Sequence, residues 1–135
     1  MPTLRSTTIG LQGRYLLSAR DQHLVADATP SRGGPGQAWL AAELLLAALA
    51  TCAQAVIESS AREQAVVLRC VRVHGEAEAD EARPGHYAFV RLDFELEGAT
   101  QEEARALVGV YLNICPIYGS VSRGAPVTVN IRGLA

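Results

Sequence analysis

The stretch that decides the fold is residues 38–59, AWLAAELLLAALATCAQAVIES. It contains no Gly or Pro and is dense in Ala and Leu, which lose little side-chain freedom in a helix. Its apolar residues fall on every face of that helix, which is typical of a helix buried on all sides. Polar residues such as Glu43 and Thr51 interrupt it too often for a membrane span. We therefore predict the central helix of a soluble domain, continuing to about Glu63, with Cys52 near the middle of the stretch.

Length and composition limit the class of protein. A chain of 135 residues, of which 49% are hydrophobic, is typical of a single globular domain, here spanning 1–135. The net charge of −2 offers no basic surface, and we expect neither a nucleic-acid nor a membrane partner. The first residues, MPTLRSTT, lack the apolar run of an export signal. We therefore expect a cytoplasmic protein whose three cysteines are reduced or take part in redox chemistry.

The chain before the long helix reads as a short β meander followed by a loop. Apolar segments within residues 3–28 are separated by turn sequences, QG at 12–13 and RDQ at 20–22. Residues 30–36, PSRGGPG, have no periodicity and break secondary structure. These glycines suit either a plain connector or a phosphate cradle. The connector is favoured because all twelve basic residues are Arg, and the phosphate-binding loop motif requires Lys.

Two strands are expected after the long helix. Residues 66–78 and 88–97 each alternate between apolar and polar side chains, as half-buried strands do. The segment between them, 79–85, contains Pro and Gly and suits a hairpin loop. Charges of opposite sign on the outer faces of the two strands favour an antiparallel pair with one side in solvent.

A second helix is expected over residues 100–114. Thr100 and Glu103 fit a capping box, in which each side chain accepts a hydrogen bond from a backbone N–H at the helix start. Pro116 ends this helix because the residue before a proline avoids helical geometry. A last strand alternates over 127–132. The order of strands, long helix, two strands, helix and strand predicts an α+β fold with a mostly antiparallel sheet.

The cysteines are the candidate reactive groups. Cys52 and Cys115 lie on the buried faces of the two predicted helices, where a cysteine can also serve as a small hydrophobic side chain. Cys70 lies on the polar face of a strand between Arg69 and Arg72, and we interpret it as a spectator.

Other common chemistries lack their residues. The three histidines stand alone, and none is three to five residues from a Cys or another His, so no metal site is predicted. The Gly-x-Ser-x-Gly motif of serine hydrolases is absent. The absence of Lys also excludes Schiff-base chemistry.

Two segments resemble the signature regions of the OsmC/Ohr family. The first is residues 41–52, AAELLLAALATC, entered through the glycine-rich residues 33–36. The second is residues 115–117, CPI, which precede GAPV at 124–127. The likeness covers roughly residues 9–131, with the elements in matching order. The pair of segments is fairly specific for the family, whereas either segment alone is a weak signal.

The resemblance implies an OsmC-like fold with a long central buried helix and a second helix, in an intertwined homodimer. It implies a thiol peroxidase that reduces small organic hydroperoxides with the help of a thiol reductant and without a cofactor. Carried over by position, Cys52 is the peroxidatic cysteine and Cys115 the resolving cysteine. The family's functional Arg falls nearest to Arg14, with Arg20 as the second choice, and its functional Glu nearest to Glu43.

The sequence departs from the hydroperoxide-resistance branch of the family around this Glu. That branch carries Pro and Glu where this chain has Ala41 and Ala42, and Glu43 stands nine residues before Cys52. Nine residues of ideal helix place Glu43 about 13 Å along the axis and about 180° around from Cys52. Glu43 therefore joins the site only through a bend, a late helix start or a partner subunit, and the pattern is closer to the broader OsmC-like branch.

The two cysteines are expected to differ in their electrostatics. Cys52 is in the middle of a helix, where burial raises the pKa of a thiol, so its reactivity requires a nearby cation such as Arg14. Cys115 is at the C-terminal end of its helix, where exposed carbonyl groups disfavour a negative charge. We therefore expect Cys52 to react first.

Two other classes of function stay open at this stage. A long apolar helix wrapped by an antiparallel sheet is also the architecture of hotdog-type hydrolases, including thioesterases, in which a carboxylate such as Glu43 would be needed. A non-catalytic protein with the OsmC fold could instead hold an apolar ligand at a dimer interface. Activity that survives replacement of both Cys52 and Cys115 would favour the hydrolase, and a retained ligand with inert thiols would favour the binding protein.

Overall fold

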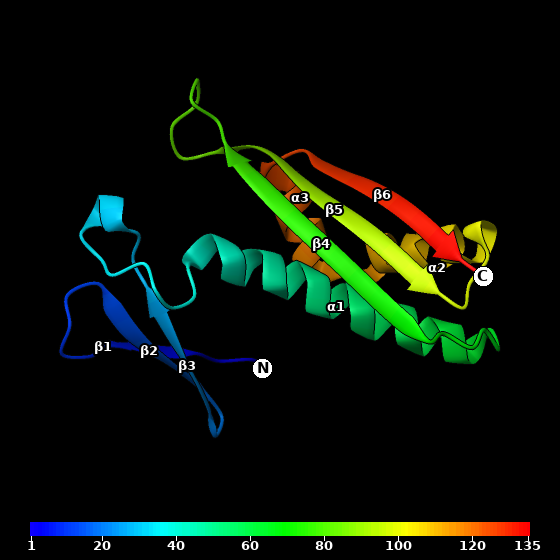
Figure 1. Cartoon of the computed structure of the whole chain (residues 1–135), viewed down its shortest axis with the longest axis horizontal. Coiled ribbons are helices and arrows are strands. Elements are labelled where there is room, and N and C mark those ends of the chain that lie inside the picture. Colours follow the sequence, from blue (N-terminus) through cyan, green and yellow to red (C-terminus); the bar gives the residue numbers. More distant parts are fainter. The chain divides into compact units, whose positions relative to one another are not determined.

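A computed structural model describes all residues from Met1 to Ala135, and they form two compact units. The first covers Met1–Leu45 and the second Leu46–Ala135. The long helix α1, Ala41–Glu63, begins in the first unit and runs on through the second. Figure 1 labels the helices and strands of both units.

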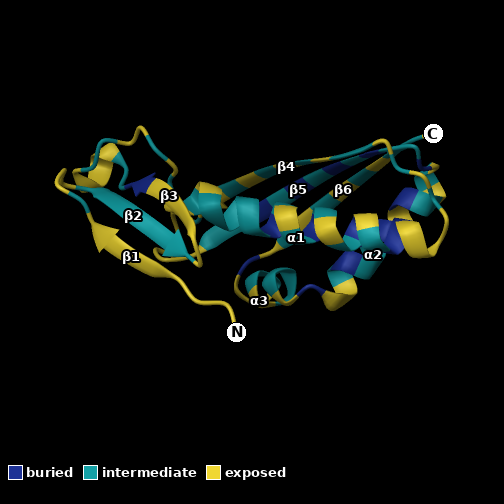
Figure 2. Ribbon diagram, turned by 90° about the horizontal axis from the view of Figure 1, so that it is seen from below, coloured by how far each residue is buried: buried dark blue, intermediate teal, exposed yellow.

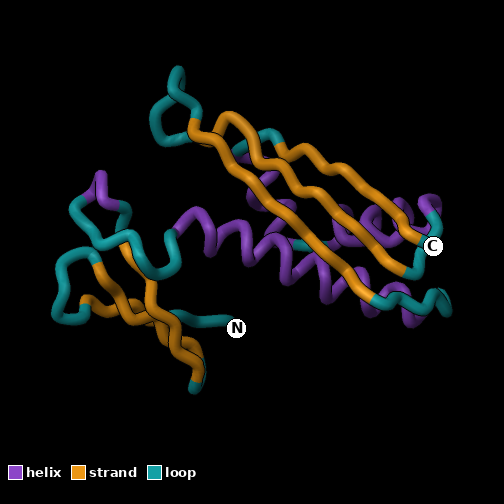
Figure 3. The backbone as a smooth tube through the Cα atoms, in the orientation of Figure 1, coloured by secondary structure: helices purple, strands orange, loops and turns teal.

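The N-terminal unit is built on a three-stranded antiparallel meander. Strands β1 (Arg5–Thr8), β2 (Arg14–Ala19) and β3 (Gln22–Asp27) pair in the order in which they occur in the chain. This confirms the meander predicted from the sequence, including its two turns. Figure 3 shows these strands and the loop that follows them.

The glycine-rich loop after β3 is a close-packed connector that includes the short 3-10 helix η1, Pro30–Arg32. Gly33 follows it with φ of 84°, a left-handed conformation that favours glycine. A Cβ on Gly34 would collide with the backbone of Ala28. These glycines are therefore explained by loop packing, in agreement with the connector interpretation.

The C-terminal unit has a three-stranded sheet with helices on one face. The strands β4 (Cys70–Ala79), β5 (Tyr87–Glu97) and β6 (Val127–Leu134) lie side by side in that order. Figure 2 shows α1, α2 (Gln101–Ile114) and α3 (Pro116–Gly124) on the same side of this sheet. The predicted antiparallel pairing of β4 with β5 is confirmed.

Strand β6 pairs with β5 in parallel, which the sequence analysis did not anticipate. The helices α2 and α3 carry the chain from the end of β5 back to its beginning, so the next strand runs in the same direction. The rest of the strand pairing is antiparallel, and the α+β class with a mostly antiparallel arrangement is confirmed.

The core of the C-terminal unit lies between the sheet and the helices. Strand β5 turns alternate apolar residues toward this core and alternate charged residues toward solvent, as its sequence predicts. Helix α2 starts with the predicted capping box of Thr100 and Glu103, and its apolar stripe faces the same core. The fully buried residues from these two elements are Val90, Leu92, Phe94, Leu96, Ala104, Leu107, Val108 and Tyr111.

Within the single chain α1 is buried on one side only. Its buried residues form one stripe, namely Leu49, Ala53, Ile57, Ser60 and Ala61. One three-stranded sheet and its helices cover only one side of a helix that is apolar all round. By length and composition α1 could cross a membrane, but this stripe belongs to the protein core.

Candidate redox site

Two thiols meet in the C-terminal unit. Cys52 projects from α1 one turn after the buried Leu49, and Cys115 lies between the end of α2 and the start of α3. Their sulfur atoms are 2.8 Å apart, and both cysteines are free thiols. A disulfide bond is about 2.05 Å long, so a small movement of the side chains would bring the sulfurs to bonding distance. The structure thus brings together the two cysteines that the sequence analysis selected.

Cys115 occupies a junction between two helices. Its backbone N–H donates to the carbonyl of Tyr111 and closes α2. Its sulfur accepts a hydrogen bond from the backbone N–H of Tyr118 at 3.4 Å, which makes Cys115 the N-cap of α3. The expectation of an electrostatically unfavourable helix end was therefore incomplete. The N-terminus of α3 supplies an N–H donor and a favourable dipole for negative charge on the same sulfur.

The immediate surroundings of Cys52 disfavour its thiolate form. Burial raises the pKa of its thiol to about 11, helped by the hydrogen bond with Cys115 and by repulsion from a charged Cys115. No positive charge contributes to this shift. At neutral pH the resting Cys52 is therefore a protonated thiol, and its activation requires a cation that comes close to the sulfur.

Aromatic rings belong to the same hydrophobic core as the two thiols. The ring of Tyr111 lies 6.0 Å from that of Phe94 and 5.6 Å from that of Tyr118, measured between centroids. Its hydroxyl donates a hydrogen bond to the carbonyl of Leu49 at 3.2 Å. Burial raises the pKa of Tyr111, so its hydroxyl stays protonated at physiological pH. The sequence placed Tyr111 on the apolar stripe of α2 but gave no sign of this polar contact.

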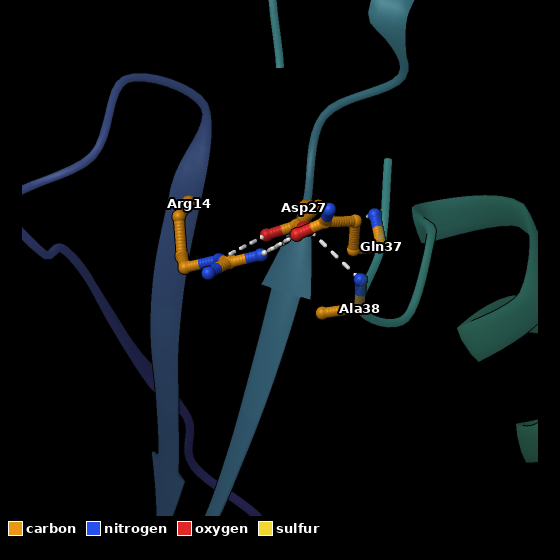
Figure 4. A network of polar contacts seen from close by, with 4 residues as sticks. All are labelled: Arg14, Asp27, Gln37 and Ala38. Atoms are coloured by element: carbon orange, nitrogen blue, oxygen red, sulfur yellow. Dashed lines mark hydrogen bonds and ion pairs between the residues drawn. The ribbon is translucent and has the colours of Figure 1, made fainter. Parts of the chain in front are cut away.

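Arg14 is held by a network within the N-terminal unit (Figure 4). Its Nε and Nη2 donate to the two carboxylate oxygens of Asp27 at 2.8 and 2.9 Å. The Asp27 carboxylate is buried and also accepts from the backbone N–H groups of Gln37 and Ala38. The Arg14 guanidinium and the two N–H donors keep the pKa of Asp27 well below its ordinary value. Arg14 was predicted as a site residue, whereas Asp27 was not, because its only signal in the sequence is an acidic residue among the apolar residues that end β3.

The other candidates have structural partners of their own. The carboxylate of Glu43 accepts a hydrogen bond from the backbone N–H of Leu40 at 2.8 Å and so caps the start of α1. Arg20 adopts a left-handed φ of 55° between β2 and β3, as a turn residue. Cys70 begins β4 and lines a cavity of about 420 Å³ between the end of α1 and that strand. No group of three or more His, Cys, Asp or Glu side chains is placed to hold a metal ion.

Comparison with known proteins decides the family. The family model described as OsmC-like protein matches residues 34–130, a segment that includes both Cys52 and Cys115. The chain belongs to the OsmC family. No curated protein shows significant sequence similarity to it.

Solved structures of OsmC-like proteins share the fold of this family member over nearly its whole length. The OsmC-like protein of Mycoplasma pneumoniae superposes with a TM-score of 0.86 at 13% identity, covering 100% of this chain and 98% of that one. An organic hydroperoxide resistance protein OsmC from Legionella pneumophila gives a TM-score of 0.77 at 21% identity, with 100% and 97% covered. The organic hydroperoxide resistance protein OhrB of Bacillus subtilis gives 0.70 at 17% identity, with 96% of each chain covered. At sequence identities this low, the structural likeness establishes the fold alone.

Proposed function

We propose that this OsmC family member is a thiol peroxidase that reduces organic hydroperoxides. The observation that carries the proposal is the 2.8 Å separation between the sulfurs of Cys52 and Cys115. Two free thiols at this distance can pass between dithiol and disulfide within one folded unit. Family membership and the structural likeness to organic hydroperoxide resistance proteins support this assignment.

The proposed reaction has three steps. The Cys52 thiolate attacks the terminal peroxide oxygen, the O–O bond breaks, and the alkoxide leaves and takes a proton to become an alcohol. Cys52 is then a sulfenic acid, which the Cys115 thiol attacks to form the disulfide and release water. A dithiol reductant finally exchanges with the disulfide, which restores both protein thiols and leaves the reductant oxidised. The reductant is proposed by chemical class only.

The surroundings of the sulfurs favour an organic substrate over hydrogen peroxide. Cys52 follows the buried Leu49 on α1, and the rings of Phe94 and Tyr111 belong to the same apolar cluster. An alkyl or aryl group on the peroxide would gain by burial against such side chains, whereas hydrogen peroxide has no apolar part to bury. Small hydrophobic hydroperoxides are therefore the proposed substrates.

We propose Arg14 as the cation that activates Cys52. Its guanidinium is fixed by Asp27, and its Nη1 is the nitrogen left without a hydrogen-bond partner. Because the Asp27 carboxylate compensates most of the positive charge of the Arg14 guanidinium, Arg14 would act mainly as an oriented hydrogen-bond donor toward the Cys52 thiolate or the peroxide. A role for Glu43 would require α1 of a second copy, since this carboxylate caps its own helix.

Steady-state turnover of cumene or tert-butyl hydroperoxide with a dithiol such as dithiothreitol tests this function. The wild-type protein is expected to turn over both substrates and to prefer them to hydrogen peroxide. Absence of turnover with either organic hydroperoxide, in folded protein with reduced thiols, would contradict the proposal.

Cys70→Ser is expected to leave hydroperoxide reduction nearly unchanged. Cys70 begins β4, and no hydrogen bond joins it to Cys52 or Cys115. The measurement is kcat and KM with cumene hydroperoxide beside the wild-type protein. Loss of most of the activity, with an unchanged circular dichroism spectrum, would mean that the roles of the cysteines are assigned wrongly.

A homodimer that buries the open side of α1 is also proposed. The exposed or half-buried apolar residues of this helix, such as Leu44, Leu45 and Ala55, need cover that one chain does not supply. Light scattering at micromolar concentration is expected to give the mass of two chains. A monomer of 14.3 kDa would contradict this expectation.

One observation favours a second function, the binding of an apolar ligand without catalysis. The pKa of Cys52 at about 11 is that of an inert thiol unless a cation comes close. Native mass spectrometry of the purified protein separates the two functions. A retained apolar molecule together with thiols that do not react with hydroperoxides would favour the binding protein.

A further inference from the structure

Tyr111 joins the two helices one turn away from the paired thiols. It is fully buried, and its hydroxyl donates to the backbone carbonyl of Leu49 on α1. Leu49 precedes Cys52 by three residues, and Tyr111 precedes Cys115 by four. On each helix this is about one turn. The hydroxyl–carbonyl contact and the sulfur–sulfur contact are therefore two adjacent links between the same helices.

We propose that Tyr111 is a positioning residue, whose hydroxyl holds α1 against the end of α2 so that the sulfurs of Cys52 and Cys115 stay within reach of each other. The proposal deepens the proposed peroxidase function and rests on it for its place in the reaction cycle. The step it serves is the attack of the Cys115 thiol on the Cys52 sulfenic acid. In that step an S–S bond forms, the S–O bond breaks and water leaves.

The geometry separates this role from ordinary core packing. The ring of Tyr111 fills space between Phe94 and Tyr118, and a phenylalanine ring would fill the same space. The hydroxyl adds the only hydrogen bond between side chain and backbone that links α2 to α1. The carbonyl of Leu49 also accepts the helical hydrogen bond from the backbone N–H four residues later, and it keeps this bond when the hydroxyl is removed. Removal of the hydroxyl therefore loosens the link without leaving a buried carbonyl unpaired, and Tyr111→Phe is expected to fold.

The Tyr111 hydroxyl does not itself transfer a proton. Burial raises its pKa, which keeps the proton on the oxygen throughout the neutral range. Its effect is expected on the proximity of the two sulfurs, which is measured as the effective concentration of one thiol toward the other.

The test is a disulfide equilibrium, which requires no hydroperoxide. Wild-type and Tyr111→Phe proteins are equilibrated in mixtures of reduced and oxidised glutathione. In the overall exchange the two protein thiols become a disulfide, and one oxidised glutathione becomes two reduced molecules. The effective concentration is expected to fall about two- to tenfold in Tyr111→Phe, the effect of one lost hydrogen bond on an equilibrium. Tyr87→Phe, which removes a hydroxyl from β5, is the matched control and is expected to match the wild type.

The outcomes distinguish positioning from packing. A purely structural hydroxyl would stabilise the dithiol and disulfide forms equally, so its loss would lower the melting temperature of both and leave the glutathione equilibrium unchanged. That result would overturn the proposal, as would a Tyr111→Phe protein that does not fold or a wild-type protein that forms no Cys52–Cys115 disulfide. A Tyr111-dependent disulfide in a protein that reduces no hydroperoxide would overturn the proposed function alone.

Discussion

Cys115→Ser is expected to consume one equivalent of cumene hydroperoxide and then stop, whereas Cys52→Ser is expected to consume none. Without Cys115 the sulfenic acid on Cys52 has no resolving thiol, so it accumulates or is over-oxidised. Cys115 itself contributes to the raised pKa of Cys52, through its hydrogen bond and its charge. Its removal therefore lowers the pKa of Cys52 and preserves the first step.

The measurement for these variants is hydroperoxide consumed per protein in a single turnover, with trapping of the sulfenic acid by dimedone. Dimedone adduct is expected on residue 52 in Cys115→Ser and on no residue in Cys52→Ser. Cys70→Ser serves as the matched control, because it removes a thiol and leaves the pair intact. If Cys52→Ser consumed one equivalent, the α3 N-terminus would be the activating group and Cys115 the first nucleophile.

Asp27→Asn is expected to loosen the N-terminal unit more than any other loss of a carboxylate in residues 1–45. The buried carboxylate holds the Arg14 guanidinium with both oxygens and also accepts two backbone N–H groups from the loop after η1. An amide offers one acceptor oxygen and places an NH₂ group against these donors. Trypsin cuts this chain only after Arg, so faster cleavage at Arg14, Arg20 and Arg32 measures the loosening.

Asp21→Asn is the matched control, because Asp21 lies in the turn between β2 and β3 and makes no ion pair. The Asp27 interaction should also respond to acid. Its pKa is lowered in the folded state, so its contribution to stability is present above the ordinary value of about 3.8 and is lost as pH falls below it. Equal trypsin resistance of Asp27→Asn and the wild type at neutral pH would contradict this account of the network.

Local sequence patterns predicted the elements of this fold well. The capping box at Thr100 and the alternation along β5 depend on residues close in the chain, and both were found as expected. The parallel pairing of β6 was not predicted, because strand direction depends on how α2 and α3 return the chain to the sheet. The all-round apolar pattern of α1 predicts burial on every side but does not say whether one chain or a second copy supplies the cover, and the single chain buries one stripe.

The candidate site was predicted only in part, because contacts between residues far apart in the chain leave no local pattern in the sequence. Cys52 and Cys115 could be chosen from their segments, although nothing in their separation of 63 residues predicts a 2.8 Å contact. The capping of α3 by Cys115 and the bond from Tyr111 to Leu49 depend on tertiary placement. Asp27 was missed because its backbone partners lie ten and eleven residues further along the chain, in a loop without periodicity.

The pH dependence of alkylation reports the state of Cys52 directly. With a pKa of about 11, its reaction with iodoacetamide is expected to rise about tenfold per pH unit up to that value. If Arg14 activates Cys52 in the assembled protein, the rise should level off at a lower pH, and Arg14→Ala should restore the steep profile. Identical profiles for Arg14→Ala and the wild type would remove Arg14 from the proposal.

The pairing of Cys52 with Cys115 is the central claim, and tryptic peptide mapping after one equivalent of cumene hydroperoxide tests it most directly. Because trypsin cuts only after Arg, the three cysteines fall in separate peptides, 33–62, 70–72 and 106–123. We predict that the reduced protein yields three free thiol peptides and that the treated protein yields 33–62 joined to 106–123 by a disulfide, with 70–72 still reduced. Treated protein in which 33–62 and 106–123 both remain free, or in which 70–72 is the oxidised peptide, would contradict the claim.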